Sequence, residues 1–147
     1  MSQGYVRGSV PEDCQIIADN MRKADIAEIK ASSNWDPLEA MTNGFIYSNP
    51  PFTVVQNKGD TPVAMWGIVP EYDAVVSKGR IWLLGTPAIK DVRMQFLREC
   101  AHWIRKATEG YDVVYNHIDK RNTLHIRWLK WLEFTFVREM PQYGHEK

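Results

Sequence analysis

Apolar residues recur at helical spacing through the first third of the chain. Between residues 14 and 21 they fall every three or four positions, which is the period of an α-helix. The apolar phase shifts two residues later, and this shift predicts a kink or two abutting helices. A further helix is expected to begin at Asp36, a suitable N-cap, and to end near Gly44 or Tyr47. A short strand over residues 5–10 should precede these helices.

The middle of the chain has the apolar runs that are typical of β-strands. Residues 52–56 and 62–69 are rich in β-formers and flank a polar loop at residues 57–60, which predicts a β-hairpin. Residues 71–79 are expected to form a loop. Residues 80–85 are nearly all apolar, as a central strand that is buried on both faces requires.

The last third of the chain alternates between strand and helix patterns. An apolar stripe that begins at Val92 predicts a helix that ends at about residue 107, and a strand at 111–118 should follow it. A tryptophan-rich helix over residues 122–132 and a strand over 135–140 complete the pattern. The predicted order is therefore β-α-α-β-β-β-α-β-α-β. This order predicts an α+β fold, an α/β sandwich in which helices flank a mixed, mostly antiparallel sheet.

Composition and charge indicate an ordinary globular domain. Of the 147 residues, 44% are apolar and 24% are charged, so the whole chain is expected to form one domain with a loose tail at residues 141–147. Lys and Arg number 18, as do Asp and Glu, and this balance argues against nucleic acid as a partner. No apolar run resembles a signal peptide or approaches the roughly 20 residues of a membrane span. Cys14 and Cys100 lack zinc-site spacing and are expected to be buried thiols.

Five side chains capable of polar chemistry gather within ten residues, from the end of the strand predicted at 111–118 into the helix that follows it. In α/β units the carboxyl end of a strand and the N–H groups of the next helix converge, so a ligand commonly binds there. His117 and Asp119 could be a base and its orienting carboxylate, or a half-buried histidine and a turn residue. Asn122 could bind a ligand or cap the helix. No metal-ligand spacing is evident among them. The five are Asn116, His117, Asp119, Asn122 and His125.

The order of elements and the last helix resemble the Gcn5-related N-acetyltransferase (GNAT) family. In that family the last helix commonly reads Asn-x-x-Ala-x-x-x-Tyr-x-x-x-Gly-Phe, and Asn122 and Phe134 have the matching spacing. Residues 6–13 also resemble the family's first strand running into its first helix. The resemblance implies a GNAT-like fold, acetyl-CoA as the cofactor and acyl transfer to an amine. It also implies cofactor contacts at Leu84, Gly85, Thr86, Lys90, Arg93 and Asn122.

Two parts of the family's machinery are replaced in this chain. The phosphate-binding pattern Arg/Gln-x-x-Gly-x-Gly/Ala has no glycines at residues 86–93, where Pro87 has no N–H and Asp91 would repel phosphate. The tyrosine that commonly protonates the leaving thiolate falls on Leu129, which cannot donate a proton. His125 stands in place of the small alanine. It is either a replacement acid or a histidine that forms hydrogen bonds within the fold.

A narrower resemblance covers the nine residues from Asn122 to Lys130. Their sequence, Asn-Thr-Leu-His-Ile-Arg-Trp-Leu-Lys, is similar to a run in an internal virion protein family of short-tailed bacteriophages. This resemblance implies phage virion or host proteins as partners, in the host cytoplasm or the virion interior. Together with the missing glycines at residues 86–93 and the leucine in place of the tyrosine acid, it predicts a GNAT-fold binding protein that has lost ordinary acetyl transfer. The alternative is an active acetyl-CoA-dependent N-acyltransferase in which His125 or water replaces the tyrosine acid.

Overall fold

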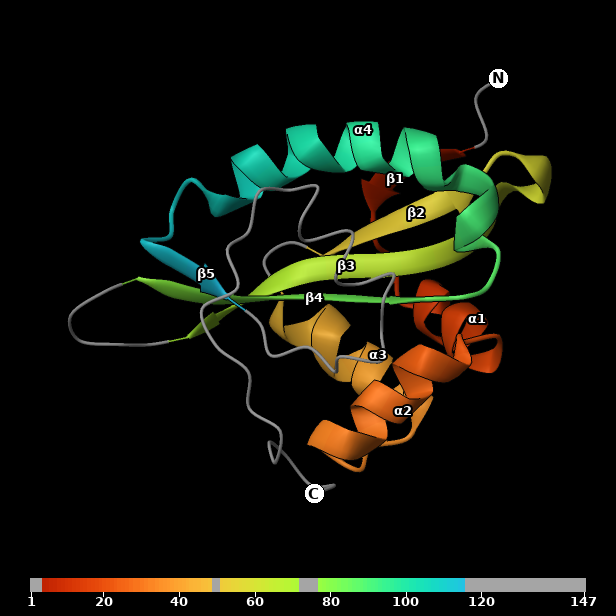
Figure 1. Cartoon of the computed structure of the whole chain (residues 1–147), viewed down its shortest axis with the longest axis horizontal. Helices are drawn as coiled ribbons and strands as arrows, with labels where there is room; N and C mark the ends of the chain where they lie inside the picture. The colour runs from red at the N-terminus through yellow and green to blue at the C-terminus, as the bar shows by residue number, and fades with distance from the viewer. Residues whose placement is uncertain (1–3, 49–50, 72–76, 116–147) are drawn as a thin grey trace.

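The computed structural model describes residues 4–48, 51–71 and 77–115, and Figure 1 shows how they are arranged. The last helix and the last strand predicted from the sequence lie outside these ranges. The described ranges include residues 6–13, which resemble the family's first strand and first helix, and residues 86–93, which correspond to its phosphate-binding pattern.

A five-stranded sheet forms the middle layer of the described structure (Figure 1). The strands lie side by side in chain order, and all neighbours are antiparallel except the last two strands, which are parallel. This arrangement confirms the predicted α+β class with a mixed, mostly antiparallel sheet. The strands are β1 (Gly4–Gly8), β2 (Phe52–Gln56), β3 (Thr61–Glu71), β4 (Lys78–Gly85) and β5 (Val113–Tyr115).

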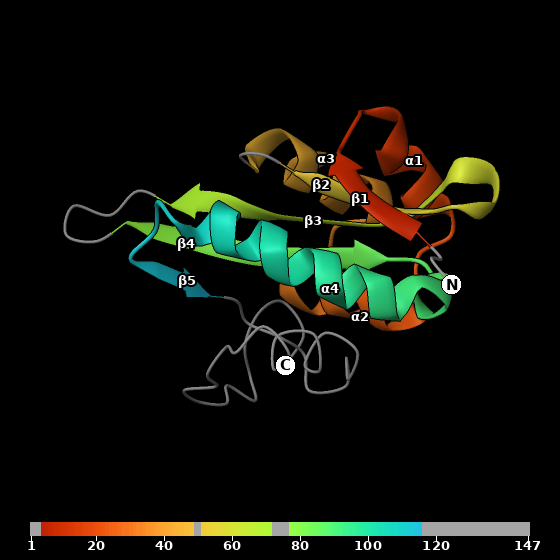
Figure 2. The ribbon, with the colours of Figure 1, turned by 90° about the horizontal axis from the view of Figure 1, so that it is seen from above.

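Helices cover both faces of this sheet. Three short helices lie against one face, and one long helix crosses the other (Figures 1 and 2). They are α1 (Glu12–Asp19), α2 (Lys23–Ser32), α3 (Pro37–Tyr47) and α4 (Ile89–Thr108). The predicted phase shift separates α1 from α2, which is the second of the two alternatives that the sequence left open. None of the helices in the described ranges is long and apolar enough to cross a membrane.

The predicted hairpin joins β2 to β3 through a 3-10 turn, η1 (Lys58–Asp60). Gly59 lies in this turn with a φ of 74°, a conformation that glycine adopts without steric cost. The loop predicted at residues 71–79 is too long, because β3 continues to Glu71 and β4 already begins at Lys78. These two residues are register partners, so backbone pairing extends both strands beyond the apolar pattern.

β4 is buried on both faces, as predicted for a central strand. Ile81 and Leu83 belong to the apolar cluster that includes α4, whereas Trp82 and Leu84 belong to the cluster that includes α1 and α3. Alternate side chains of a strand point to opposite faces, so β4 joins the two halves of the core.

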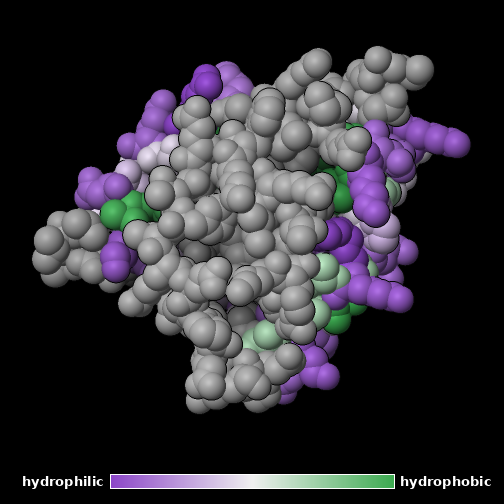
Figure 3. All heavy atoms as spheres, viewed as in Figure 1, coloured by the Kyte–Doolittle hydropathy of each residue, from purple (hydrophilic) through white to green (hydrophobic). Residues whose placement is uncertain are grey.

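Figure 3 shows the surface coloured by hydropathy. Around the edge of this view the coloured residues are mostly hydrophilic, and a few small hydrophobic patches lie between them.

A buried carboxylate joins the first strand to the first helix. Asp13 is 1% exposed, and both nitrogens of the Arg7 guanidinium fork donate to it, at 2.8 and 3.0 Å. The Val10 N–H and the Thr53 hydroxyl donate to the same carboxylate. Burial raises the pKa of Asp13, but these hydrogen bonds and the Arg7 charge outweigh burial and hold that pKa below its ordinary value. The network fixes the start of α1 against β1 and β2.

Candidate functional site

The end of β4 and the turn into α4 form the first candidate site. Leu84 and Gly85 end the strand, Thr86 lies in the turn, and Lys90 lies in the first turn of α4. The structure therefore brings together four of the residues that the resemblance implies as cofactor contacts. Arg93 follows on the same helix.

Both backbone polar groups of Gly85 form hydrogen bonds within the protein. Its N–H donates to Oδ2 of Asp25 at 2.9 Å, and its carbonyl accepts the Arg22 N–H at 2.8 Å. Asp25 is 1% exposed, and its other carboxylate oxygen lies 3.1 Å from Nη1 of Arg22. These contacts hold the start of α2 against the end of β4. A thioester carbonyl that needed the Gly85 N–H would have to displace the Asp25 carboxylate.

The backbone N–H groups around the start of α4 are also engaged. Those of residues 89, 90 and 91 donate to the carbonyls three residues before them, at 3.1, 3.3 and 3.0 Å. The N–H and the hydroxyl of Thr86 both donate to the Val63 carbonyl, at 2.8 and 3.1 Å. Pro87 has no N–H. A phosphate at a helix start binds to backbone N–H groups, so a pyrophosphate that bound to residues 89–91 would have to displace these hydrogen bonds.

Side chains of both charges lie at this helix start. Lys90 and Asp91 are both exposed and carry opposite charges. An acidic residue in the first turn of a helix stabilises the helix dipole, but it also repels an incoming phosphate. The predicted effect of Asp91 on phosphate binding stays a prediction.

A second polar cluster lies where β3, β4 and β5 meet. The Tyr115 hydroxyl donates to Oε1 of Glu71, and Nε of Arg80 lies 3.8 Å from Oε2 of the same carboxylate. Arg80 and Tyr115 are register partners and form the last described pair between β4 and β5. The cluster ties the two parallel strands together immediately before the polar segment that begins at Asn116.

Sequence reasoning did not identify Asp25, Glu71 or Tyr115 as residues of the candidate site. Asp25 has a weak local signal, because it lies in the first turn of a helix and three residues after Arg22. Glu71, which accepts the Tyr115 hydroxyl, is 44 residues from Tyr115 in the sequence. Gly85, whose N–H donates to Asp25, is 60 residues from Asp25. Contacts of that kind follow from the strand topology and have no local pattern.

The predicted catalytic residues His117, Asp119 and His125 lie outside the described residues, as does the predicted contact residue Asn122. Their roles stay predictions. Within the described ranges, no group of three or more His, Cys, Asp and Glu side chains is placed to hold a metal ion.

The described architecture is that of the GNAT fold. It has a β-strand followed by helices, three antiparallel strands, and a parallel β4–α4–β5 unit, in the order that the resemblance implies. The chain matches no protein-family model and no curated protein. The fold assignment therefore depends on the structure and on its likeness to solved structures.

Several solved structures have this fold. The protein yncA of Salmonella typhimurium, named as an acetyltransferase and solved with its cofactor acetyl-CoA, matches with a TM-score of 0.61 at 16% identity over 99% of this chain and 87% of that chain. TTHA1254 of Thermus thermophilus matches with a TM-score of 0.58 at 14% identity over 92% of both chains. A GNAT-family acetyltransferase of Bacillus anthracis matches with a TM-score of 0.57 at 10% identity over 89% of this chain and 79% of that chain. Identities this low show a shared fold alone.

Proposed function

We propose that this chain is a GNAT-fold protein that acts by binding a protein partner and has lost ordinary acetyl transfer. The observation that carries the proposal is the occupied end of β4, where the Asp25 carboxylate accepts the Gly85 N–H. The engaged N–H groups at the start of α4 also support it.

The thioester end of acetyl-CoA would compete poorly for Gly85. A hydrogen bond from an N–H to a carboxylate is roughly twice as strong as one to a neutral carbonyl. Displacing Asp25 would also leave a buried carboxylate with one partner fewer, which costs about 1–3 kcal/mol. The exchange of one acceptor for the other is therefore unfavourable.

The pyrophosphate end would meet a second obstacle. To bind the N–H groups of residues 89–91, it would have to break the hydrogen bonds that these groups make to residues 86–88. Asp91 would repel the phosphates, whereas Lys90 would attract them. Weak binding at both ends of the cofactor supports a role in which acetyl-CoA is not turned over.

The partner, on this proposal, is a phage virion or host protein. This part rests on the Asn122–Lys130 run, which is similar to an internal virion protein family of short-tailed bacteriophages. Quantitative mass spectrometry of purified phage particles tests the virion location. A fixed copy number per particle is expected, and the absence of the chain from particles would exclude the virion as its location.

An active N-acyltransferase is the second candidate, because yncA holds acetyl-CoA on the same fold. In this alternative, His125 or a water molecule protonates the leaving thiolate. The amine acceptor would lose its proton before it attacks the thioester carbonyl. Asp25 would then have to release the Gly85 N–H when the cofactor enters.

Thermal unfolding in the presence of acetyl-CoA separates the two candidates. A ligand at 100 times its Kd stabilises a protein by about 2.7 kcal/mol, which raises Tm by several degrees. We expect no shift at about 1 mM acetyl-CoA, the upper end of common KM values. S-acetylpantetheine and adenosine 3′-phosphate 5′-diphosphate test the thioester end and the pyrophosphate end of the cofactor separately. A saturable shift with acetyl-CoA, together with thiol release in the presence of an amine, would establish the enzyme instead.

A further inference from the structure

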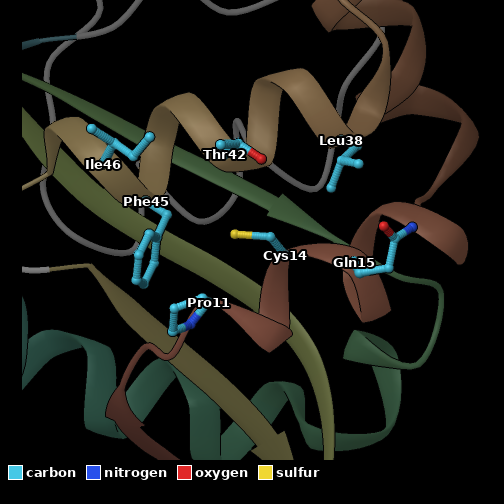
Figure 4. Close-up of a pocket in the computed structure, with 7 residues that line it drawn as sticks. All are labelled: Pro11, Cys14, Gln15, Leu38, Thr42, Phe45 and Ile46. Atoms are coloured by element: carbon cyan, nitrogen blue, oxygen red, sulfur yellow. The ribbon is translucent and has the colours of Figure 1, made fainter.

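A shallow groove of about 340 Å³ lies between α1 and α3. Figure 4 shows Pro11, Phe45 and Ile46 at one end of it and Gln15 and Leu38 at the other. The groove includes none of the residues at the end of β4, so it is separate from the candidate site described above.

The floor of the groove belongs to the core. Cys14 lies there and is 5% exposed, and its free thiol confirms the prediction of a buried cysteine. Burial raises the pKa of this thiol, so it stays protonated at neutral pH. The groove therefore offers apolar contact and no reactive thiolate.

The walls of the groove carry apolar side chains that remain in contact with solvent. Of the lining residues, Leu38 is 39% exposed and Ile46 is 61% exposed; Tyr47, which follows Ile46 in the chain but does not line the groove, is 60% exposed. Ile46 and Tyr47 are the two most exposed of the large apolar side chains that the structure describes. Single exposed apolar residues are common, but a group of them around an apolar hollow marks an interaction surface.

The length of the groove suits a helix. Leu38 and Ile46 lie eight residues apart on α3, which is about 12 Å along the helix axis or a little more than two turns. A helix laid between α1 and α3 would place apolar side chains at positions i, i+4 and i+7 along it. This is the way in which amphipathic helices bind to hydrophobic grooves.

Acidic side chains flank the groove. Glu12 and Asp19 lie on the exposed side of α1, and Glu39 follows Leu38 on α3. The Gln15 amide donates to Asp19 at 2.6 Å, so this carboxylate adjoins the lining. The described residues that line the groove carry no charge of either sign, so the nearby charges are those of these acidic side chains. A partner with basic residues beside its apolar stripe is therefore complementary to this surface.

We propose that the groove between α1 and α3 binds a basic amphipathic helix of a partner protein. The proposal rests on the proposed function, because it supplies the surface through which a binding protein would act. Its test is independent of the cofactor test: acetyl-CoA binding would overturn the account of the β4 end and would leave the groove as it is.

A synthetic helical peptide of about 18 residues, or five turns, with leucine along one face and lysine elsewhere, is a suitable probe. A matched peptide carries glutamate in place of every lysine. Fluorescence anisotropy of each labelled peptide, titrated with the full chain, gives its Kd. We expect saturable binding of the lysine peptide that weakens with added salt, and binding of the glutamate peptide at least tenfold weaker.

Variants of the exposed side chains locate the binding site. Ile46→Ser and Leu38→Ser should each weaken binding of the lysine peptide about tenfold, the effect of removing one apolar anchor. Ile26→Ser on α2 is the matched control, because Ile26 is 39% exposed, like Leu38, and does not line the groove. The control should leave the Kd unchanged, and urea midpoints should show that all three variants are folded.

Four outcomes would overturn the proposal. They are the lack of saturable binding, equal binding of the glutamate peptide, an equal effect of Ile26→Ser, and a Kd that Ile46→Ser and Leu38→Ser leave unchanged. Sedimentation of the chain alone adds a further test. If the chain self-associates and Ile46→Ser abolishes this association, a second copy occupies the groove and the proposal is wrong.

Discussion

Replacing Asp25 by alanine should lower the free energy of unfolding more than a change at an exposed acid does. The substitution removes a carboxylate that is 1% exposed and that contacts the Gly85 N–H at 2.9 Å and the Arg22 guanidinium at 3.1 Å. A lost hydrogen bond to a charged group costs about 1.5–3 kcal/mol, and a broken buried ion pair costs about 3–5 kcal/mol. The side chain of Arg22 is 15% exposed and keeps some access to water. We therefore expect a loss of about 3 kcal/mol, at the lower end of the range for a buried ion pair.

Urea denaturation followed by tryptophan fluorescence measures this loss. Asp25→Asn is an informative second variant, because its amide oxygen can still accept the Gly85 N–H while the charge opposite Arg22 is gone. It should lose less stability than Asp25→Ala. Asp19→Ala is the control, since it removes an exposed acid of a neighbouring helix, and it should change the free energy of unfolding by no more than about 0.5 kcal/mol.

Asp25→Ala should lower the free energy of unfolding but strengthen the binding of a thioester. Asp25→Ala frees the Gly85 N–H, so S-acetylpantetheine should stabilise this variant and leave the wild type unaffected. A loss of stability no larger than that of Asp19→Ala would refute the reasoning, because the carboxylate would then not hold α2 to β4. If the Asp25 carboxylate contributes so little to stability, a thioester carbonyl could displace it from the Gly85 N–H.

Three further changes test other parts of the fold. Asp13→Asn should destabilise the chain at neutral pH. Its difference from wild type should shrink as pH falls below about 4, through the lowered pKa of Asp13 in the folded state, because only the ionised carboxylate pairs with Arg7. Urea midpoints across pH measure this, and a difference independent of pH would contradict it. Gly44→Ala should lower the urea midpoint although alanine favours a helix by about 1 kcal/mol, because the new Cβ would lie 2.6 Å from the Trp82 ring. A higher midpoint would mean that the ring can move aside. Asp36→Ala should cost about 1 kcal/mol in thermal or urea unfolding, and Asp36→Ser should restore most of it, because both polar residues can cap α3. Equal stability of the two variants would show that the cap contributes little.

The parts of the fold that the sequence predicted correctly have local signals. Asp36 and Glu39 are three residues apart and form the capping box that begins α3, with the Glu39 N–H donating to Asp36 at 2.8 Å. The hairpin follows from β-formers on both sides of a loop that contains Gly59. The continuous apolar run of β4 predicted its burial on both faces. In each case, neighbouring residues determine the local structure.

The candidate site could be predicted only in part, because its hydrogen bonds join distant segments. The sequence placed Gly85 and Thr86 at the end of a strand, and the structure agrees. That the Gly85 N–H donates to Asp25 depends on how α2 lies across the sheet, and no spacing of residues encodes this. The same holds for Tyr115 and Glu71, whose contact requires the register of three strands. The predicted strand at 62–69 ends too early for a related reason. Backbone pairing with β4 extends β3 to Glu71, beyond the apolar pattern.

The end of β4 shows how a backbone group at a strand end can be satisfied within the protein. A backbone N–H at the end of a buried strand needs an acceptor, which can be a ligand, a water molecule or a side chain. In this chain the acceptor is the Asp25 carboxylate, so this hydrogen bond holds α2 to the end of β4. Two of the exposed apolar side chains, Leu38 and Ile46, line the groove between α1 and α3. On the proposed function, the end of β4 has a structural role and the groove between α1 and α3 is the surface that binds a partner.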